Sequence, residues 1–170
     1  SFNSPYGAAV DGSGNVYVAD YQNHLVRKIT SGGVVTTLAG SGSQGSADGT
    51  GTAASFRFPS GVAVDGSGNV YVADQGNHRI RKITSAGVVT TLAGSSMGFA
   101  DGTGTAASFN SPFGVVVDGS GNDVYVAGGG GHRIRKIATT LPSGSTTNDA
   151  TLPLIFTSSE ATTNFVVGDI

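Results

Sequence analysis

Three histidines occupy equivalent places in the chain and could form a metal site. His24, His78 and His132 lie 54 residues apart, and Asp20 and Asp74 precede the first two by four residues. Neutral imidazole is the commonest metal ligand in proteins, and three histidines leave one zinc position open for a reactant. A ligand set must converge on one point, however, whereas residues at one repeat position point the same way in every copy. We therefore expect a hydrogen bond between aspartate and histidine that closes a turn, with zinc binding as the weaker alternative.

The segment DGSGN offers a second candidate for metal chemistry. It runs from Asp11 to Asn15, recurs from Asp65 to Asn69, and appears again from Asp118 to Asn122. Its oxygens could bind calcium, but each copy has one carboxylate and lacks the downstream acid of a calcium loop. Glycine and asparagine at these places are typical of a tight hairpin turn. The sequence therefore predicts turns here, and no cofactor or metal.

These candidate residues belong to a repeat of 53 or 54 residues. The sequence divides into copies at about 1–55, 56–108 and 109–140. A phenylalanine that precedes a proline by three residues opens each copy; these are Phe2, Phe56 and Phe109. The surrounding loop is polar, so we expect each ring to be buried between neighbouring repeats, where an aromatic side chain removes a large apolar area from water.

Each copy reads as four short β-strands. In the second copy the segments GVAVD, NVYVAD, RIRKI and VVTTLAG are rich in β-branched residues, and Gly-rich turns separate them. The segment NVYVAD is apolar on both pleat faces, so its sheet needs a neighbouring sheet on each side. Radially stacked, four-stranded antiparallel blades provide such neighbours. The expected fold class is therefore all-β, built from β-propeller blades.

The segment from Pro59 to Ile83, PSGVAVDGSGNVYVADQGNHRIRKI, closely resembles the NHL repeat. The resemblance extends from residue 1 to about 140 and implies three blades of a propeller that commonly has six. Some similar propellers are lyases that bind zinc through histidines, and others bind RNA. The loop ADGTGTAASF is similar to that of bacterial extracellular members of the family.

The third copy departs from the pattern. VYVAD becomes VYVAG, and the next turn becomes GGGGH, which places Gly128 where an aspartate is expected. The expected fourth strand is replaced by a Ser/Thr/Pro/Gly linker at about 141–151. A β-prone tail follows at 152–170. It could fold back into the missing place, pair with another copy, or begin an immunoglobulin-like domain.

Composition narrows the functional classes. The chain has no cysteine and a net charge of −2, which excludes thiolate chemistry and gives no overall attraction to nucleic acid or anionic membranes. Eight of the nine basic residues lie in the third strands, where we expect them to be solvated and paired with aspartates. No apolar run is long enough to span a bilayer. No nucleophile–base pair or serine elbow is present.

Near-identical copies indicate a scaffold, because a catalytic site needs different residues in different roles. The sequence therefore predicts a non-catalytic, extracellular structural or interaction module, with a composition that favours a prokaryotic cell surface. Its expected partners are other copies of itself or further blades, assembled head-to-tail into a ring or filament. The alternatives are a propeller that binds glycan or peptide and, third, a lyase or lactonase.

Overall fold

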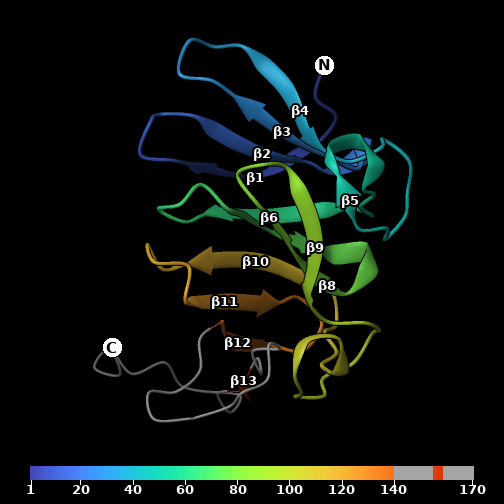
Figure 1. Ribbon diagram of the computed structural model, residues 1–170. Helices are drawn as coiled ribbons and strands as arrows, with labels where there is room; N and C mark the ends of the chain where they lie inside the picture. Colours follow the sequence, from blue (N-terminus) through green and yellow to red (C-terminus); the bar gives the residue numbers. More distant parts are fainter. Residues whose placement is uncertain (140–154, 159–170) are drawn as a thin grey trace.

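The computed structural model describes residues 1–139 and 155–158 as an all-β stack of three antiparallel sheets (Figure 1). Blade one consists of β1 (Pro5–Val10), β2 (Val16–Asp20), β3 (Leu25–Ile29) and β4 (Val35–Ala39). Blade two consists of β6 (Pro59–Val64), β7 (Val70–Asp74), β8 (Arg79–Ile83) and β9 (Val88–Ala93), with the short β5 (Gly49–Thr50) on the outer edge of β9. The all-β propeller fold expected from the repeats is confirmed.

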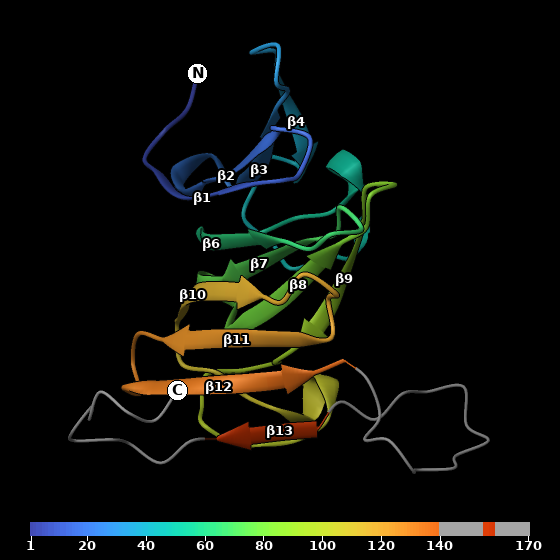
Figure 2. The ribbon, with the colours of Figure 1, turned by 90° about the vertical axis from the view of Figure 1, so that its left-hand side faces the viewer.

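Blade three consists of β10 (Pro112–Val117), β11 (Asp123–Gly128), β12 (Arg133–Ala138) and β13 (Ile155–Ser158). Strand β13 pairs antiparallel with β12, so the tail of the same chain occupies the place of the fourth strand (Figure 2). The linker and the rest of the tail lie outside the described residues. The only helices in the described part of the chain are single 3-10 turns: η1 (Tyr21–Asn23), η2 (Gly51–Ala53), η3 (Gln75–Asn77) and η4 (Gly104–Ala106). None of them is long and apolar enough to cross a membrane.

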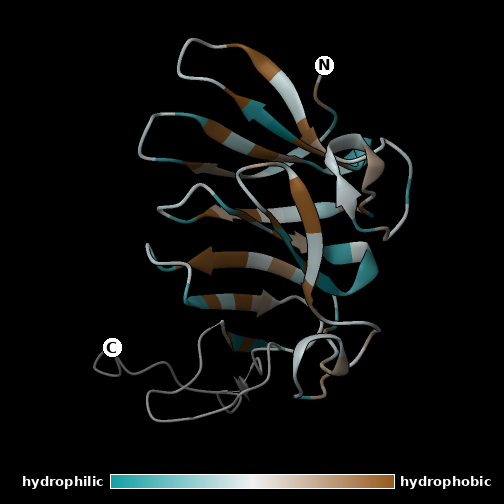
Figure 3. Ribbon diagram, viewed as in Figure 1, coloured by the Kyte–Doolittle hydropathy of each residue, from teal (hydrophilic) through white to brown (hydrophobic). Residues whose placement is uncertain are grey.

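Apolar side chains on both faces of blade two form the core, as the apolar character of its first two strands predicts. Figure 3 shows hydrophobic residues along the strands of the stack. One cluster joins blade one to blade two and includes Tyr17, Val26 and Phe56. The other joins blade two to blade three and includes Tyr71, Ile80 and Phe109. Tyr71 and Phe56 are fully buried, which explains why the second copy keeps apolar residues on both pleat faces.

The innermost strands β1, β6 and β10 lie one after another along the inner edge of the stack (Figure 2). A Cβ atom added to Gly7 would lie 2.6 Å from the carbonyl oxygen of Ser60, and one added to Gly61 would lie 2.5 Å from that of Phe113. The blades can approach this closely only because glycine has no side chain.

Candidate functional site

The DGSGN segments form turns whose carboxylates are already satisfied by the chain. Asp11 Oδ1 accepts hydrogen bonds from the backbone amides of Ser13 and Asn15, and Oδ2 accepts from the side chains of Asn15 and Tyr17. The Asn15 side chain is the largest cause that lowers the pKa of Asp11, to about 2. Asp65 makes the same four contacts in blade two. The partners of each carboxylate are amide and hydroxyl groups that donate hydrogen bonds to it. Each aspartate therefore holds its turn together through these bonds.

The aspartates that end the second strands are buried and bind an arginine. Asp74 Oδ1 accepts from the backbone amide of Arg57, while Oδ2 accepts from Asn77 and from Arg81 at 2.9 Å. Asp20 accepts in the same way from the backbone of Asn3 and from the side chains of Asn23 and Arg27. The hydrogen bond expected between aspartate and histidine is therefore replaced by bonds to asparagine and arginine, whose donors reach the carboxylate across the turn.

The histidines bind the next blade instead. The backbone amide of Phe58 donates to His24 Nδ1 at 3.2 Å, and that of Ser111 donates to His78 Nδ1 at 3.1 Å. Each histidine has a left-handed backbone, with φ of 56° at His24 and 58° at His78, which turns its ring toward the following blade. We call these two contacts the inter-blade hydrogen bonds. Ser60 Oγ also donates across the second junction, to the carbonyl oxygen of Phe113. His132, in the last blade, is exposed.

The histidines do not form a metal site in this structure. Each side chain lies at the end of a different blade, and those of His24 and His78 contact the following blade. Within the described residues, no three His, Asp or Glu side chains come together as a metal-binding cluster. The arrangement is that of a contact repeated at both junctions between the three blades.

Two basic residues of the third strands, Arg81 and Arg135, are buried rather than solvated, but they pair with aspartates as expected. Arg81 is fully buried, with Asp48 at 2.7 Å, Asp74 at 2.9 Å and the ring of Phe56 at 5.2 Å. Arg135 is 4% exposed and binds Asp101, the carbonyl oxygens of Ala100 and Ser108, and the ring of Phe109. The loop ADGTGTAASF therefore wraps an arginine of the blade that follows it. The charges of Arg81 and Arg135 are paired with carboxylates inside the protein, so fewer positive charges are left on its surface to bind nucleic acid.

The three repeat phenylalanines lie in different environments. Phe56 is fully buried and Phe109 is 2% exposed, each in the cluster between two blades. Phe2 is half-buried, beneath Arg27 at 5.4 Å, on the face of blade one that points away from blade two. The difference follows from the absence of a described blade on that side.

Both ends of the stack expose residues whose equivalents are buried inside it. We call the outer side of blade three the C-terminal face; there Tyr125 is 40% exposed, whereas its equivalents Tyr17 and Tyr71 are 4% and 0% exposed. Val116 on the same face is 62% exposed, and its equivalent Ala63 is 7% exposed. We call the outer side of blade one the N-terminal face; there Val35 is 42% exposed and its equivalent Val89 only 1%. Each face thus repeats one half of a blade-to-blade interface.

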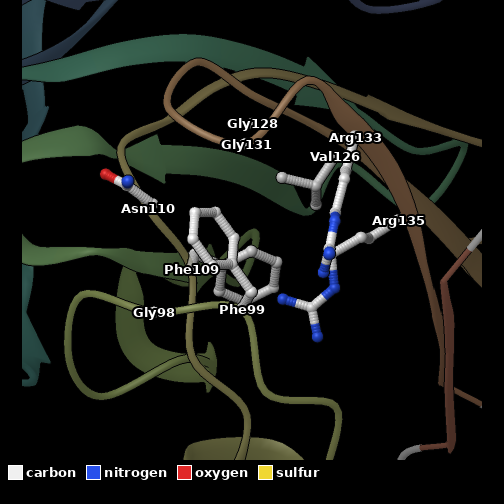
Figure 4. Close-up of a pocket in the computed structure, with 9 residues that line it drawn as sticks. All are labelled: Gly98, Phe99, Phe109, Asn110, Val126, Gly128, Gly131, Arg133 and Arg135. Atoms are coloured by element: carbon white, nitrogen blue, oxygen red, sulfur yellow. The ribbon is translucent and has the colours of Figure 1, made fainter. Parts of the chain in front are cut away.

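Blade three contains a small cavity where the aspartate is missing. It lies between Arg135, Phe109 and the GGGGH turn, with Phe99 and Asn110 on its wall (Figure 4). A Cβ atom added to Gly131 would collide with the Phe99 ring, which takes up the space of the asparagine found in the other blades. Arg133 lies over the same ring at 5.1 Å. The glycine-rich turn therefore leaves a space, and the Phe99 ring occupies it.

One group of side chains was missed by the sequence reasoning. Tyr6, Tyr21, Phe58 and Phe113 form a continuous series of ring contacts across all three blades, which we call the aromatic cluster. Tyr6 lies 4.5 Å from Tyr21 and 5.7 Å from Phe113, and Tyr21 lies 5.0 Å from Phe58, measured between ring centroids. The signal that could have revealed it is variation between copies, because these positions differ where most of the repeat is identical.

Comparison with known proteins agrees with the geometry. The NHL repeat matches residues 2–29 and 56–83. The chain is 32% identical over 156 residues to NHL repeat-containing protein 2 from Gallus gallus; the match covers 83% of this chain and 21% of that protein.

Two solved bacterial structures are also similar to the chain. A Bacteroides thetaiotaomicron protein of unknown function has a TM-score of 0.72 and 32% identity over 81% of this chain and 36% of its own. An auxiliary nutrient binding protein from Bacteroides ovatus has a TM-score of 0.64 and 26% identity over 73% of this chain and 34% of its own. The chain thus spans about a fifth of the curated relative and about a third of these structures. The repeats, the four-stranded blades and these similarities together place the chain in the NHL-repeat family of β-propeller proteins.

Proposed function

We propose that the protein is a non-catalytic interaction module that assembles head-to-tail through its two end faces. The observation that carries the proposal is the exposure of Tyr125, Val116 and Val35 at positions that are buried wherever two blades meet. Exposed apolar patches of this kind mark protein interfaces. The N-terminal face of a second copy is the natural occupant of the C-terminal face, because two homologous interfaces already exist within the chain.

The geometry of the innermost strands supports the same partner. Gly7 and Gly61 each lie tightly against the backbone of the following blade, whereas a Cβ atom at Gly114 would meet only Ala127 of its own blade, at 3.4 Å. A further blade could therefore approach β10 as β10 approaches β6. The two end faces differ, so the contact is heterologous; it closes into a ring where the rotation allows and otherwise grows into a filament.

Other features support a scaffold at a prokaryotic cell surface. The buried arginines, aspartates and histidines described above are occupied in contacts within and between blades, and this use of them favours a structural role over a lyase or lactonase. The similar nutrient binding protein comes from a Bacteroides species. Further blades of a longer parent chain are the other partner that the same end faces would accept.

The test is the mass of the assembly in solution, measured by light scattering over a range of concentrations. Wild-type protein is expected to form a closed species of constant mass or a polymer that grows with concentration. Val35→Glu and Val116→Glu each place a charge on one end face, so each variant alone should be a monomer. Mixed together, they should form a one-to-one dimer, because each variant retains the face that the other lacks.

Val88→Glu is the matched control. Val88 is a 39% exposed valine on the outer strand of blade two, away from both end faces, and its replacement should leave assembly unchanged. A wild-type protein that stays monomeric at micromolar concentration would refute self-assembly. If only addition of separate NHL blades from a parent chain restored a larger species, the second partner would be correct.

A further inference from the structure

The aromatic cluster lies where the repeat breaks its own symmetry. Tyr6 and Phe113 occupy the position of Ser60, and Tyr21 occupies that of Gln75. Phe58 occupies the position of Ser4 and Ser111. At three repeat positions, aromatic residues thus stand where another copy has a polar one, and the structure brings these rings into contact.

Packing between blades does not require these rings. The junction between blades two and three has Ser60, Gln75 and Ser111 where the first junction has Tyr6, Tyr21 and Phe58. Both junctions nevertheless keep the same inter-blade hydrogen bond, at 3.2 Å to His24 and 3.1 Å to His78. The second junction shows that serine and glutamine suffice to join two blades. The aromatic residues therefore need another explanation.

Phe58 adds a conformational cost to this arrangement. Its φ of 53° lies in the left-handed region, which a bulky side chain seldom adopts. The equivalent serines have φ of 50° and 49°, so the backbone shape belongs to the repeat and only the large side chain is particular to this blade. Such unfavourable conformations are concentrated at ligand-binding and active sites.

The rings adjoin an open cleft on the inner edge of the stack. The cleft has a volume of about 200 Å³ and is lined by Tyr6, Phe113, Ser60 and the glycine-containing strands β1, β6 and β10. Tyr6 is 57% exposed and Phe113 is 46% exposed, so both rings present a large apolar area to a ligand. None of the described residues that line the cleft carries a charge. The site thus suits a small neutral group.

The wall between the rings is polar backbone. Strands β1, β6 and β10 are each the inner edge of their own sheet, so their outward-facing backbone groups have no strand partner. The backbone forms the surface of the cleft at Gly7, Gly61 and Gly114, because these residues have no side chain to cover it. Ser60 Oγ donates to the carbonyl oxygens of Pro112 and Phe113, so these two acceptors already have a partner. Uncharged aromatic faces beside a polar backbone fit a ring that carries an apolar face and a rim of hydroxyl groups. An apolar peptide side chain would offer the polar backbone no hydrogen bond.

We propose that the aromatic cluster and the adjoining cleft bind a neutral sugar ring of an oligosaccharide, which stacks on Tyr6 and Phe113 and hydrogen-bonds to the inner strands. The cleft shares Gly114 of β10 with the side of blade three that a further blade would approach, but Tyr6 and Ser60 lie away from that contact. Assembly is measured as the mass in solution and sugar binding by titration, so failure of one proposal can be told from failure of the other.

The test is calorimetric titration of the full chain with neutral oligosaccharides, using maltohexaose, cellohexaose and xylohexaose as probes. Tyr6→Ser, Phe58→Ser and Phe113→Ser each install a residue that another blade already has at the same repeat position, so the fold is expected to tolerate them. Tyr6→Ser and Phe113→Ser should weaken binding by about tenfold or more through loss of a stacking surface. Phe58→Ser, which lies behind the Tyr21 ring and does not line the cleft, should have a smaller effect in the same direction.

Val88→Ser is the matched control, because Val88 is a 39% exposed apolar residue outside the cluster and away from both end faces. It should leave sugar binding unchanged, and thermal melts of all four variants show whether each is folded. The proposal is wrong if none of the three oligosaccharides binds at millimolar concentration, or if binding survives both Tyr6→Ser and Phe113→Ser. Binding of a tyrosine-containing peptide or of tetramethylammonium in place of the sugars would likewise overturn it.

Discussion

Blades two and three share the strand sequence RIRKI but hold its central arginine by different contacts. Arg81 binds two carboxylates, Asp48 from the preceding loop and Asp74 from its own blade. Arg135 keeps the loop carboxylate, Asp101, but Gly128 stands where Asp74 would be. The loop contact is therefore the part of the network that both blades retain, and the buried aspartate is the part that blade three replaces with a cavity and Phe99.

The comparison is tested most strongly by Asp74→Gly, which gives blade two the residue of blade three. Asp74 and Arg81 are both fully buried, so the change leaves a buried positive charge with one counter-ion fewer. Loss of one partner of a buried pair costs about 3–5 kcal/mol. We expect that decrease in the free energy of unfolding, measured by urea denaturation at one fixed protein concentration.

Asp48→Ala is the control for this change. It removes the other carboxylate of the same arginine, but the Asp48 side chain is 50% exposed and partly screened by water. Exposed ion pairs contribute about 0–1 kcal/mol, so the loss should be much smaller. Equal losses for the two variants would show that blade two does not depend on its buried aspartate.

The reverse replacement, Gly128→Asp, tests the same comparison by giving blade three the aspartate of blade two. A Cβ atom at Gly128 would have no neighbour closer than 3.7 Å, so the site has room for a side chain. The new carboxylate would lie beside Arg135 and the backbone of Asn110, as Asp74 lies beside Arg81 and Arg57. We expect a gain of about 1 kcal/mol in the free energy of unfolding, since the desolvation of a carboxylate offsets part of the hydrogen bonds it forms.

The matched control for this gain is Gly131→Asn, which restores the other missing residue of the turn. Its Cβ atom would collide with Phe99, so this variant should lose stability. A thermal melt that shows stabilisation by Gly131→Asn and destabilisation by Gly128→Asp would contradict the account of the cavity.

The sequence was sufficient for features that depend on local pattern. The repeat period, the four strands of the first two blades and the tight DGSGN turns follow from β-branched residues and glycine positions, and the structure has them. The partners of Asp20, His24 and Arg81 were not predictable in the same way. They depend on which side of a turn faces the next blade, and that is set by the left-handed backbone at the histidine and by the path of the inter-blade loop.

The aromatic cluster was missed for a related reason. Tyr6, Phe58 and Phe113 are far apart in the sequence, and each looks like an isolated departure from the repeat. Only the convergence of the inner strands brings them together. Their variation was visible in the sequence, but its meaning required the spatial arrangement.

The smallest expected effect concerns the inter-blade hydrogen bonds, which both complete junctions share. Burial is the main cause that lowers the pKa values of His24 and His78, and the charge of Arg57 lowers them further. A lowered pKa means that the folded protein binds fewer protons than the unfolded chain. The free energy of unfolding is therefore undiminished above the ordinary histidine pKa of about 6.5 and decreases as the pH falls from there to the lowered values.

This pH dependence can be separated from that of the DGSGN carboxylates. Burial raises the pKa of Asp74, so the dependence is assigned to the two histidines by the difference between a variant and the wild type. Hydrogen bonds lower the pKa of Asp11 to about 2, and those to Asp65 also lower its pKa, so these groups act in a more acidic range. The double variant His24→Asn/His78→Asn supplies an amide oxygen as acceptor and a residue that tolerates the left-handed backbone, but it cannot titrate. We expect urea denaturation at a series of pH values to show a flatter slope just below pH 6.5 for this variant than for the wild type. An unchanged slope would mean that protonation of these two side chains does not weaken the junctions.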